Sequence, residues 1–341
     1  MPAGARPDRL GALRRFGVAI TVLTLLGHTL LGFEQPWIYP FVAVAITATM
    51  DLILATLDAR ANGRQPSYVG GVIKLIDFLL PAHITGLAIA LLLYPGERLG
   101  PLVFACVVAI SSKYLLRAGL PGHKKHFLNP SNFGIATTLL LFPAVGIAPP
   151  YQFTERIDGV ADWILPLLIV FTGTFLNARF TRRLPLIAAW LFGFGAQAVV
   201  RSSVFETSLA ASLVPMTGVA FVLFTFYMVT DPATTPMPNL LQIAFGGSVA
   251  ATYGFLMTVH VAFGLFFSLA IVCCVRGAFI SLRVAHIPHT RVDVSLGDQS
   301  RMNGNPAHAA NIEPRFVAAI STSGELTTQR ESAQRQATAA Q

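Results

Sequence analysis

Long apolar runs separated by short polar stretches dominate the sequence. A helix needs roughly 20 mainly apolar residues to cross the hydrocarbon core of a bilayer, and about ten stretches of the chain meet that description. The strict apolar and polar alternation of membrane barrel strands is absent. The pattern therefore predicts an all-α, polytopic membrane protein. The predicted spans cover residues 15–33, 37–57, 75–94, 100–117, 130–146, 162–178, 184–200, 210–229, 240–257 and 258–280.

Composition and charge agree with a membrane location. Hydrophobic residues make up 54% of the 341 residues and charged residues only 12%, whereas soluble domains carry about 25% charged residues. The net charge of +8 could suggest a nucleic-acid partner, but the basic residues gather in every second loop between the predicted spans. Cytoplasmic loops of membrane proteins carry such an excess, so the bilayer is the expected partner, nucleic acid is not, and both termini are expected in the cytoplasm. The basic residues that set this orientation are Arg9, Arg14, Arg15, Arg60, Arg64, Lys74, Arg117, Lys124, Lys125, Arg179, Arg182, Arg183, Arg276, Arg283 and Arg291.

The chain divides into a membrane domain and a polar tail. Residues 1–282 contain every predicted span, and the first span lacks a following small-residue cleavage site, which indicates that it is retained. Residues 283–341 are rich in Gln, Ser, Thr, Ala and Asn and have too few apolar residues to form a core. We expect this segment to be a disordered cytoplasmic tail.

No motif for a nucleotide or for an iron-sulfur cluster is present. The chain contains no phosphate-cradling loop and no dinucleotide-binding glycine pattern. Cys106, Cys273 and Cys274 lack the spacing of zinc or iron-sulfur ligands. Apolar packing is the favoured role for these cysteines, and a metal site shared with a partner protein is the alternative.

Two spans end in polar segments that contain proline. They are SSKYLLRAGLPGHKKHFLNPSNFG, residues 111–134, and FYMVTDPATTPMPN, residues 226–239. Proline removes a backbone donor and disfavours helix in the preceding residue, so Asn129-Pro130 and Asp231-Pro232 should interrupt the helices. Asn and Asp before proline are good N-caps, which would direct two positive helix ends at an anionic or strongly hydrogen-bonding ligand. Ordinary surface loops are the alternative.

Ionisable residues within the spans lie on the same, cytoplasmic side as these breaks. Asp51, Asp77 and Lys113 are candidates for an ion pathway, because charged groups inside a membrane usually face the bundle interior or a cavity. Asp77 and Lys113 could instead extend to the membrane interface. His28, His83 and His260 also fall in predicted spans, where hydrogen-bonded packing is the commoner role.

The two interrupted segments resemble a known family. SKYLLRAG...FLNPSNFG is similar to an SK-x-L...FNP-x-x-x-G stretch, and FYMVTDPATTPMPN to an FF-x-ATDP-x-x-x-P-x-x-N stretch, of the NqrB/RnfD membrane subunits of bacterial ion-pumping NADH:quinone and ferredoxin:NAD oxidoreductases. The resemblance covers roughly residues 15–280. It implies two related five-helix halves of urea-transporter-like fold, a location in the bacterial inner membrane, and redox partner proteins that supply and accept electrons.

The resemblance also implies a non-covalent flavin, riboflavin or FMN, between the two halves near the cytoplasmic side. By position in the two motifs, the cofactor-binding candidates are Asn129, Pro130, Asn132, Thr230, Asp231, Pro232 and Thr234.

Covalent FMN, which many members of the family carry on a threonine of an outer loop, is not expected here. The family pattern resembles D-x-x-[ST]-x-A-T, and alignment on Asp158 sets Ala161 and Ile164 at the two hydroxyl positions. A hydrocarbon side chain cannot form the phosphoester, and Thr154 precedes the aspartate. The chain therefore resembles a stand-alone relative, similar to those encoded with enediyne natural-product pathways, more than a complete pump subunit.

Three functions are compatible with these patterns. The first is a flavin-dependent electron-transfer protein that acts with partner proteins, at most as a redox subunit. The second is a carrier of a small molecule or an ion that uses the same fold without a redox centre. The third is a scaffold subunit, which would have no need for the polar residues at both breaks.

Overall fold

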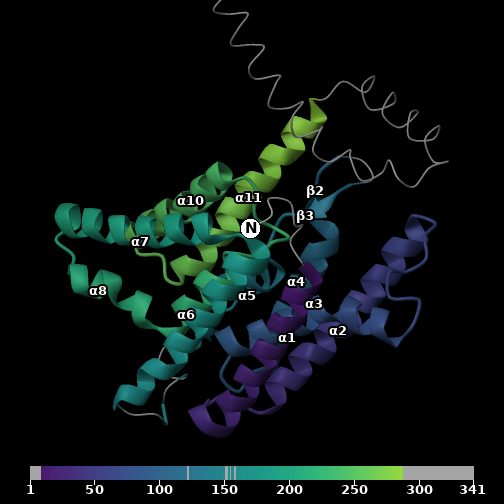
Figure 1. Ribbon diagram of the computed structural model, residues 1–341, viewed down its shortest axis with the longest axis horizontal. Coiled ribbons are helices and arrows are strands. Elements are labelled where there is room, and N and C mark those ends of the chain that lie inside the picture. Colours follow the sequence, from purple (N-terminus) through teal and green to yellow (C-terminus); the bar gives the residue numbers. More distant parts are fainter. Residues whose placement is uncertain (1–8, 121–122, 150–152, 154, 157–158, 287–341) are drawn as a thin grey trace, which may run out of the picture. The chain divides into compact units, whose positions relative to one another are not determined.

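The computed structural model describes residues 9–120, 123–149, 153, 155–156 and 159–286 (Figure 1). The chain forms two compact units, Met1–Leu282 and Arg283–Gln341. Almost all of the second unit lies outside the described residues, so the expected disorder of the tail stays a prediction.

Helices account for nearly all regular structure of the described residues. The α-helices are α1 (Arg9–Leu26), α2 (Ile38–Ala61), α3 (Val72–Leu92), α4 (Leu99–Leu115), α5 (Pro130–Leu141), α6 (Ile164–Leu176), α7 (Leu184–Phe205), α8 (Leu209–Leu213), α9 (Val219–Leu223), α10 (Asn239–Thr258) and α11 (Gly264–Ala285). Short π-helical and 3₁₀ turns are η1 (Gly27–Leu31), η3 (Gly159–Trp163), η4 (Asn177–Thr181), η5 (Val214–Thr217) and η6 (Phe224–Met228). Two small antiparallel ribbons pair β1 (Leu93–Tyr94) with β4 (Gly146–Ile147) and β2 (Arg117–Ala118) with β3 (Lys125–His126).

The lengths of these helices establish a multi-pass helical membrane protein. Among the described residues, seven helical segments are long and apolar enough to cross a bilayer, and Leu209–Met228, bent by 67°, gives an eighth. Helices α4 and α5 are shorter, with 17 and 12 residues. At 1.5 Å per residue α5 covers roughly 18 Å, less than the roughly 30 Å hydrocarbon core. The prediction of ten spans therefore stays a prediction, because α5 begins at Pro130, where the fifth span is predicted to begin, but ends at Leu141 and not at residue 146.

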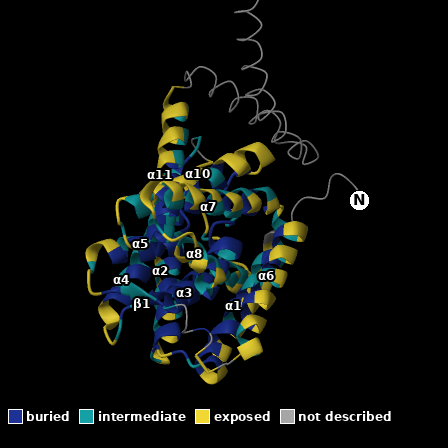
Figure 2. Cartoon of the chain, turned by 90° about the vertical axis from the view of Figure 1, so that its left-hand side faces the viewer, coloured by how far each residue is buried: buried dark blue, intermediate teal, exposed yellow. Residues whose placement is uncertain are grey.

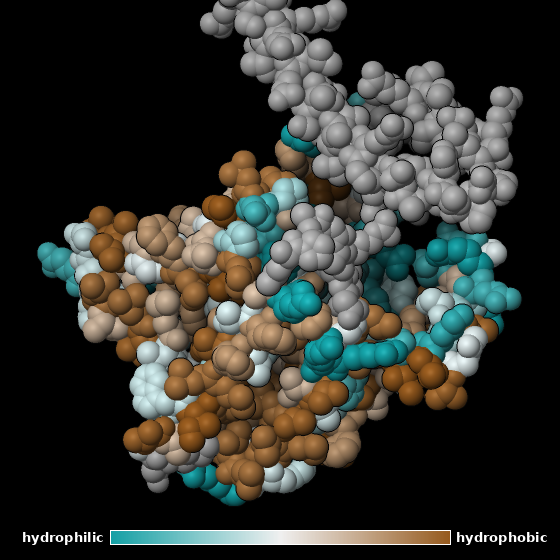
Figure 3. Space-filling view, in the orientation of Figure 1, coloured by the Kyte–Doolittle hydropathy of each residue, from teal (hydrophilic) through white to brown (hydrophobic). Residues whose placement is uncertain are grey.

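The surface of this unit is strongly apolar. Exposed positions gather on the outer faces of helices such as α1 and α6 (Figure 2), and hydrophobic residues cover most of the face in Figure 3 outside the grey region. Phe192 is 82% exposed, Phe171 73% and Phe41 66%. Exposed apolar surface on this scale marks a membrane or protein interface, which agrees with contact to lipid.

Helices α7 and α10 pack extensively against each other beside an aromatic cluster. The ring of Trp190 is fully buried and lies 5.5 Å from Phe194 and 5.6 Å from Phe224, centroid to centroid. Its indole N–H donates to the hydroxyl of Thr225 at 2.9 Å, which satisfies the polar atom that burial would otherwise leave unpaired. Gly246 of α10 allows this close approach.

We predict that Gly246→Ala destabilises the bundle and that Gly247→Ala does not. A Cβ atom at Gly246 would lie 2.6 Å from the Leu186 carbonyl oxygen and 3.1 Å from the backbone nitrogen of Trp190. A Cβ atom at Gly247 would meet no atom within 4 Å. Overpacking against a backbone costs roughly 1–3 kcal/mol, and an unhindered Gly→Ala change in a helix stays within about 1 kcal/mol. Thermal unfolding in detergent gives the midpoint temperature of each variant. Equal midpoints for Gly246→Ala and Gly247→Ala would contradict the close approach of α7 and α10 at Gly246.

Candidate functional site

Asn129 begins helix α5 and ends the first interrupted segment. Its Oδ1 accepts hydrogen bonds from the backbone N–H of Asn132 at 3.0 Å and from the hydroxyl of Ser131 at 2.9 Å. Pro130 occupies the first helical position, where a missing N–H has no cost. The predicted N-cap at Asn129 is confirmed.

Asp231 organises the second interrupted segment by binding its own chain. One carboxylate oxygen accepts from the backbone N–H of Ala233 at 3.0 Å and the other from the hydroxyl of Thr234 at 3.2 Å. The Asp231 carbonyl accepts from the hydroxyl of Thr235 at 2.6 Å. These bonds form a turn of the kind that Asp commonly initiates.

The expectation that Asp231 caps a helix is wrong. Helix α10 begins eight residues later at Asn239, and its N-cap residue is Pro238. Residues 232–238 form turns and bends, and Pro236 and Pro238 delay the next helix, because proline disfavours helix in the residue before it. The second break is therefore a turn and a bent segment, and the helix that follows it begins eight residues after Asp231.

The two breaks, about a hundred residues apart in sequence, are joined directly. The Nδ2 of Asn129 donates to Oδ2 of Asp231 at 3.4 Å and to the Met228 carbonyl at 3.3 Å. Asn132, which is 1% exposed, donates from Nδ2 to the Phe266 carbonyl at 3.0 Å. The interrupted segments are thus bound to each other and to α11.

A buried arginine holds the backbone of the second break. Arg183 is fully buried at the start of α7, and its guanidinium donates to the carbonyls of Pro236, Thr235 and Pro232, the latter two at 3.3 and 3.4 Å. The charge pattern predicts Arg183 in the loop between two spans, and it does lie between η4 and α7. Its burial was not predicted, since the side chain turns inward to satisfy carbonyls that the prolines leave without helical partners.

Arg276 of α11 acts on the same segment from the other side. Its Nη1 donates to the Thr234 carbonyl at 2.6 Å. Arginine presents several N–H donors in a planar fork, so two such side chains can satisfy a cluster of carbonyls. Neither arginine was a predicted site residue, since the carbonyls that they bind belong to distant parts of the chain.

A buried ion pair lies beside the first break. Asp51 of α2 is fully buried and accepts from Nζ of Lys113 at 2.8 and 2.9 Å and from the Tyr114 hydroxyl at 2.5 Å. Asp77 lies apart from this pair and forms a two-point ion pair with the more exposed Arg14, at 2.7 and 2.9 Å. Of the three ion-pathway candidates, the structure brings Asp51 and Lys113 together and does not add Asp77.

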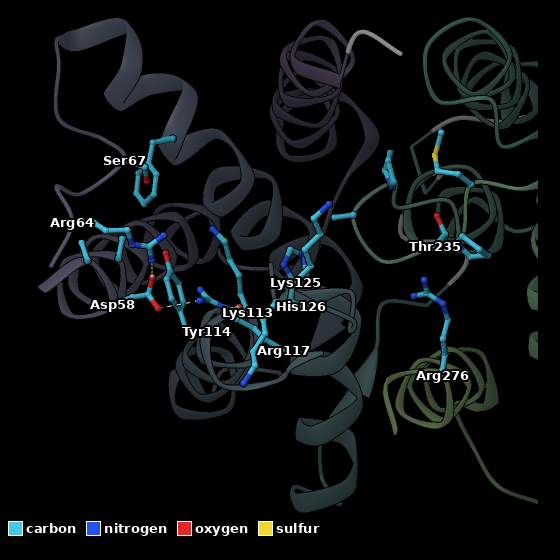
Figure 4. Close-up of a pocket in the computed structure, with 18 of the residues that line it drawn as sticks. Asp58, Arg64, Ser67, Lys113, Tyr114, Arg117, Lys125, His126, Thr235 and Arg276 are labelled. Atoms are coloured by element: carbon cyan, nitrogen blue, oxygen red, sulfur yellow. Dashed lines mark hydrogen bonds and ion pairs between the residues drawn. The ribbon is translucent and has the colours of Figure 1, made fainter. Parts of the chain in front are cut away.

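Two adjoining cavities meet at the interrupted segments. An apolar cavity of about 560 Å³ runs along α1, α3 and α6 and ends at Asn129, Pro130, Asp231 and Pro232. A second cavity of about 640 Å³ is lined mainly by polar and basic side chains (Figure 4). Both volumes fall in the range of roughly 300–1,000 Å³ of small-molecule sites. The residues that line both cavities are Lys113, His126, Pro232 and Ala233.

The other predicted cofactor residues serve the framework. Thr230 donates to the Phe226 carbonyl at 2.6 Å, while Thr234 and Asn132 make the bonds described above. These three residues are absent from the walls of both cavities, whereas Thr235 lines the basic one. The structure thus brings four of the seven predicted residues to a cavity, and their role in binding stays a prediction.

The remaining candidates lie outside this site. His28 is buried with Nδ1 2.9 Å from the Thr24 carbonyl, and His83 lies 2.8 Å from the Thr21 hydroxyl. His260 is in the turn between α10 and α11, so its assignment to a span is wrong. In the outer loop, Thr154 and Asp158 lie outside the described residues, and Ile164 is an exposed residue at the start of α6.

Comparison with known proteins adds no family. No family model matches the sequence, and no curated protein matches it either. The site therefore rests on its own geometry.

His126 is a further residue that sequence patterns did not identify. It lies opposite Arg117 in the β2–β3 ribbon and lines both cavities. Burial lowers the pKa of His126 below its usual 6.5, and the positive charges of Lys113 and Arg117 act in the same direction, while Asp231 opposes them. The ribbon pairing that brings His126 here depends on a loop with no strong strand pattern.

We predict that Asp51→Ala is far more destabilising than Asp77→Ala. Removing one partner of a buried pair costs about 3 kcal/mol or more, whereas the side chains of the Arg14–Asp77 pair are 53% and 21% exposed, and solvent screens an exposed pair so that it contributes little. The double variant Asp51→Leu/Lys113→Met should recover most of the loss, because it leaves no unpaired charge. Denaturation in detergent micelles tests this; similar losses for the two single variants would contradict it.

We also predict that His126 makes the protein less stable in mild acid. A lowered pKa in the folded state means that folding favours the neutral form of His126. Its contribution to the free energy of unfolding is therefore fully present above pH 6.5 and is lost as the pH falls through the lowered pKa. His126→Gln should therefore lose less thermal stability than the wild type between about pH 7.5 and about pH 5.5. His123→Gln, which changes an exposed histidine of the same loop, is the control. A wild-type loss equal to that of His126→Gln would contradict the prediction.

Proposed function

We propose that the protein is a flavin-dependent membrane electron-transfer protein of the NqrB/RnfD type. The observation that carries the proposal is the junction of Asn129 and Asp231, where the two family-like motifs meet at the polar end of an apolar cavity. A flavin ring has apolar faces and an edge of nitrogen and carbonyl groups. A cavity with apolar walls and a few converging polar groups suits such a molecule.

The walls of the apolar cavity support an aromatic ligand. Phe16 of α1 and Tyr227 of η6 both line it, and their rings stack at 4.6 Å between centroids with an angle of 7°. Asn129 and Asp231 offer an amide and a carboxylate to hydrogen-bond the ring edge. Such a cofactor would supply the redox chemistry, and these residues would orient it and tune its potential.

The finer architecture of the proposal is ten spans in two related halves with a urea-transporter-like fold. Two similar turns support it. Helix α1 ends in the π-helical turn η1 and helix α6 in η4, and each turn closes through a left-handed residue, Gly32 and Arg182. The bonds that close them are also alike, from Phe33 N–H to Gly27 carbonyl at 2.9 Å and from Arg183 N–H to Asn177 carbonyl at 3.1 Å. In each proposed half of five spans, the second span packs against the fourth. These pairs are α2 with α4 and α7 with α10.

Location and partners follow from the same family resemblance. We propose the bacterial inner membrane, with both termini in the cytoplasm, and partner proteins that deliver and accept electrons. An accessory step in an enediyne-type natural-product pathway is the proposed context. Covalent FMN is not part of the proposal, because Ile164 offers no hydroxyl.

A carrier of a small molecule or an ion is the second candidate. The Asp51–Lys113 pair favours it, since Asp51 is fully buried and Lys113 lines both cavities. Buried charges in membrane proteins frequently belong to transport pathways. Flavin-free, folded protein with uptake activity would support this candidate against the first.

The test is a visible absorption spectrum of the full chain purified in detergent, followed by acid precipitation. We expect a flavin spectrum and release of the yellow chromophore by acid. The amount of flavin retained by Asp231→Asn should fall by about tenfold or more, because the substitution removes the charge-assisted hydrogen bonds of a carboxylate. The fold should be kept, since the amide still offers an oxygen to the Ala233 N–H.

The matched control is Asp77→Asn, the same chemical change at a residue that lines neither cavity. Equal flavin retention in Asp231→Asn and wild type would remove Asp231 from the site. Chromophore that stays with the precipitated chain would show covalent attachment. Folded wild-type protein without flavin would overturn the redox proposal.

A further inference from the structure

The basic cavity gathers positive charge from four separate parts of the chain. Figure 4 shows Arg64 and Arg276 at opposite sides of the hollow, with Lys113, Arg117, Lys125 and His126 between them. One carboxylate, that of Asp58, lines the same cavity. The cationic side chains of the wall are Arg64, Lys113, Arg117, Lys124, Lys125 and Arg276.

The acidic groups nearby balance only part of this charge. Asp58 pairs with Arg64 at 2.8 Å and with Arg117 at 3.0 Å, and Asp51 pairs with Lys113. Among the described residues, no carboxylate lies within ion-pair distance of Lys124 or Lys125. Even with Asp231 counted beside Asp51 and Asp58, three carboxylates stand against the six cationic side chains of the wall, so the cavity keeps an excess of positive charge.

The β2–β3 ribbon explains how this excess is held in place. Register pairs Arg117 with His126 and Ala118 with Lys125, and Arg117 also donates from Nε to the Lys113 carbonyl at 2.9 Å. The ribbon therefore brings Lys124 and Lys125 next to the end of α4. Like charges repel, so this arrangement has an electrostatic cost that a bound anion would offset.

The apolar cavity continues from the basic one. Lys113, His126, Pro232 and Ala233 form walls of both, so one elongated molecule could occupy the two together. A phosphate monoester carries a charge of about −1.5 to −2 at neutral pH and three acceptor oxygens, which matches the excess of cationic donors. The apolar walls of the adjoining cavity match the organic group of such an ester.

We propose that the basic cavity is the phosphate subsite of an amphipathic phosphate monoester, whose apolar or aromatic part lies in the adjoining cavity. The inference rests on the proposed function in that it takes the apolar cavity as a binding site. Where that ligand is a flavin, the subsite selects FMN over riboflavin. Phosphatidic acid from the bilayer offers the same chemistry, and the experiment distinguishes the two sources.

The experiment compares riboflavin with FMN, which differ only in the phosphate, on the detergent-purified full chain. Fluorescence titration gives the two affinities, and native mass spectrometry after addition of phosphatidic acid or diacylglycerol gives lipid retention. The test variant is Lys124→Gln/Lys125→Gln, which removes two charges of the wall. Arg60→Gln/Lys74→Gln removes two exposed charges outside the cavity and is the matched control.

We expect FMN to bind at least about tenfold more tightly than riboflavin. One charge-assisted hydrogen bond to the phosphate is enough to give this ratio of affinities. The test variant should erase this ratio and leave riboflavin affinity unchanged, while the control keeps it. If neither flavin binds but phosphatidic acid is retained over diacylglycerol and lost in the test variant, the phosphate subsite stands and the flavin function fails. Equal affinity for the two flavins, with lipid retention either absent or unchanged in the test variant, would overturn the inference.

Discussion

The structure depends on one constraint, that backbone groups freed by a broken helix inside a membrane protein must find partners within the protein. The segment that follows Met228 contains three prolines, which have no backbone N–H to donate to the carbonyls before them. Arg183 and Arg276 supply the missing donors from α7 and α11. Because two helices hold this segment through its carbonyls, Asp231 has a fixed position, and the contact with Asn129 becomes possible.

The same constraint gives the site its amphipathic character. Polar groups collect where the helices are interrupted, and the uninterrupted helices around them present apolar side chains. The cationic residues of the basic cavity lie on the polar side, where the β2–β3 ribbon joins the end of α4 to the start of α5. A ligand at the junction would therefore meet apolar walls in one direction and positive charge in the other.

Local patterns predicted the helical architecture and one half of the junction. Apolar runs identified the long helices within a few residues, and Asn129 could be predicted as an N-cap because capping involves only the next three residues. Asp231 looked equivalent in sequence, but Pro236 and Pro238 delay the next helix. The burial of Arg183 could not be predicted, because its partners lie about fifty residues away and the charge pattern alone suggested a solvated loop.

The buried pair of Asp51 and Lys113 bears on which function suits the site. A carrier that moves its charges must separate such a pair during its cycle, and breaking a buried ion pair costs about 3–5 kcal/mol. Asp51 also accepts a hydrogen bond from Tyr114 at 2.5 Å, which adds to the cost of moving it. A stationary cofactor needs no such separation, and positive charge held at Lys113 would stabilise electron density added to a ring bound beside it. The burial of this pair suits a transport pathway, but the cost of separating it weighs more and supports the proposed redox site over a gate that opens and closes.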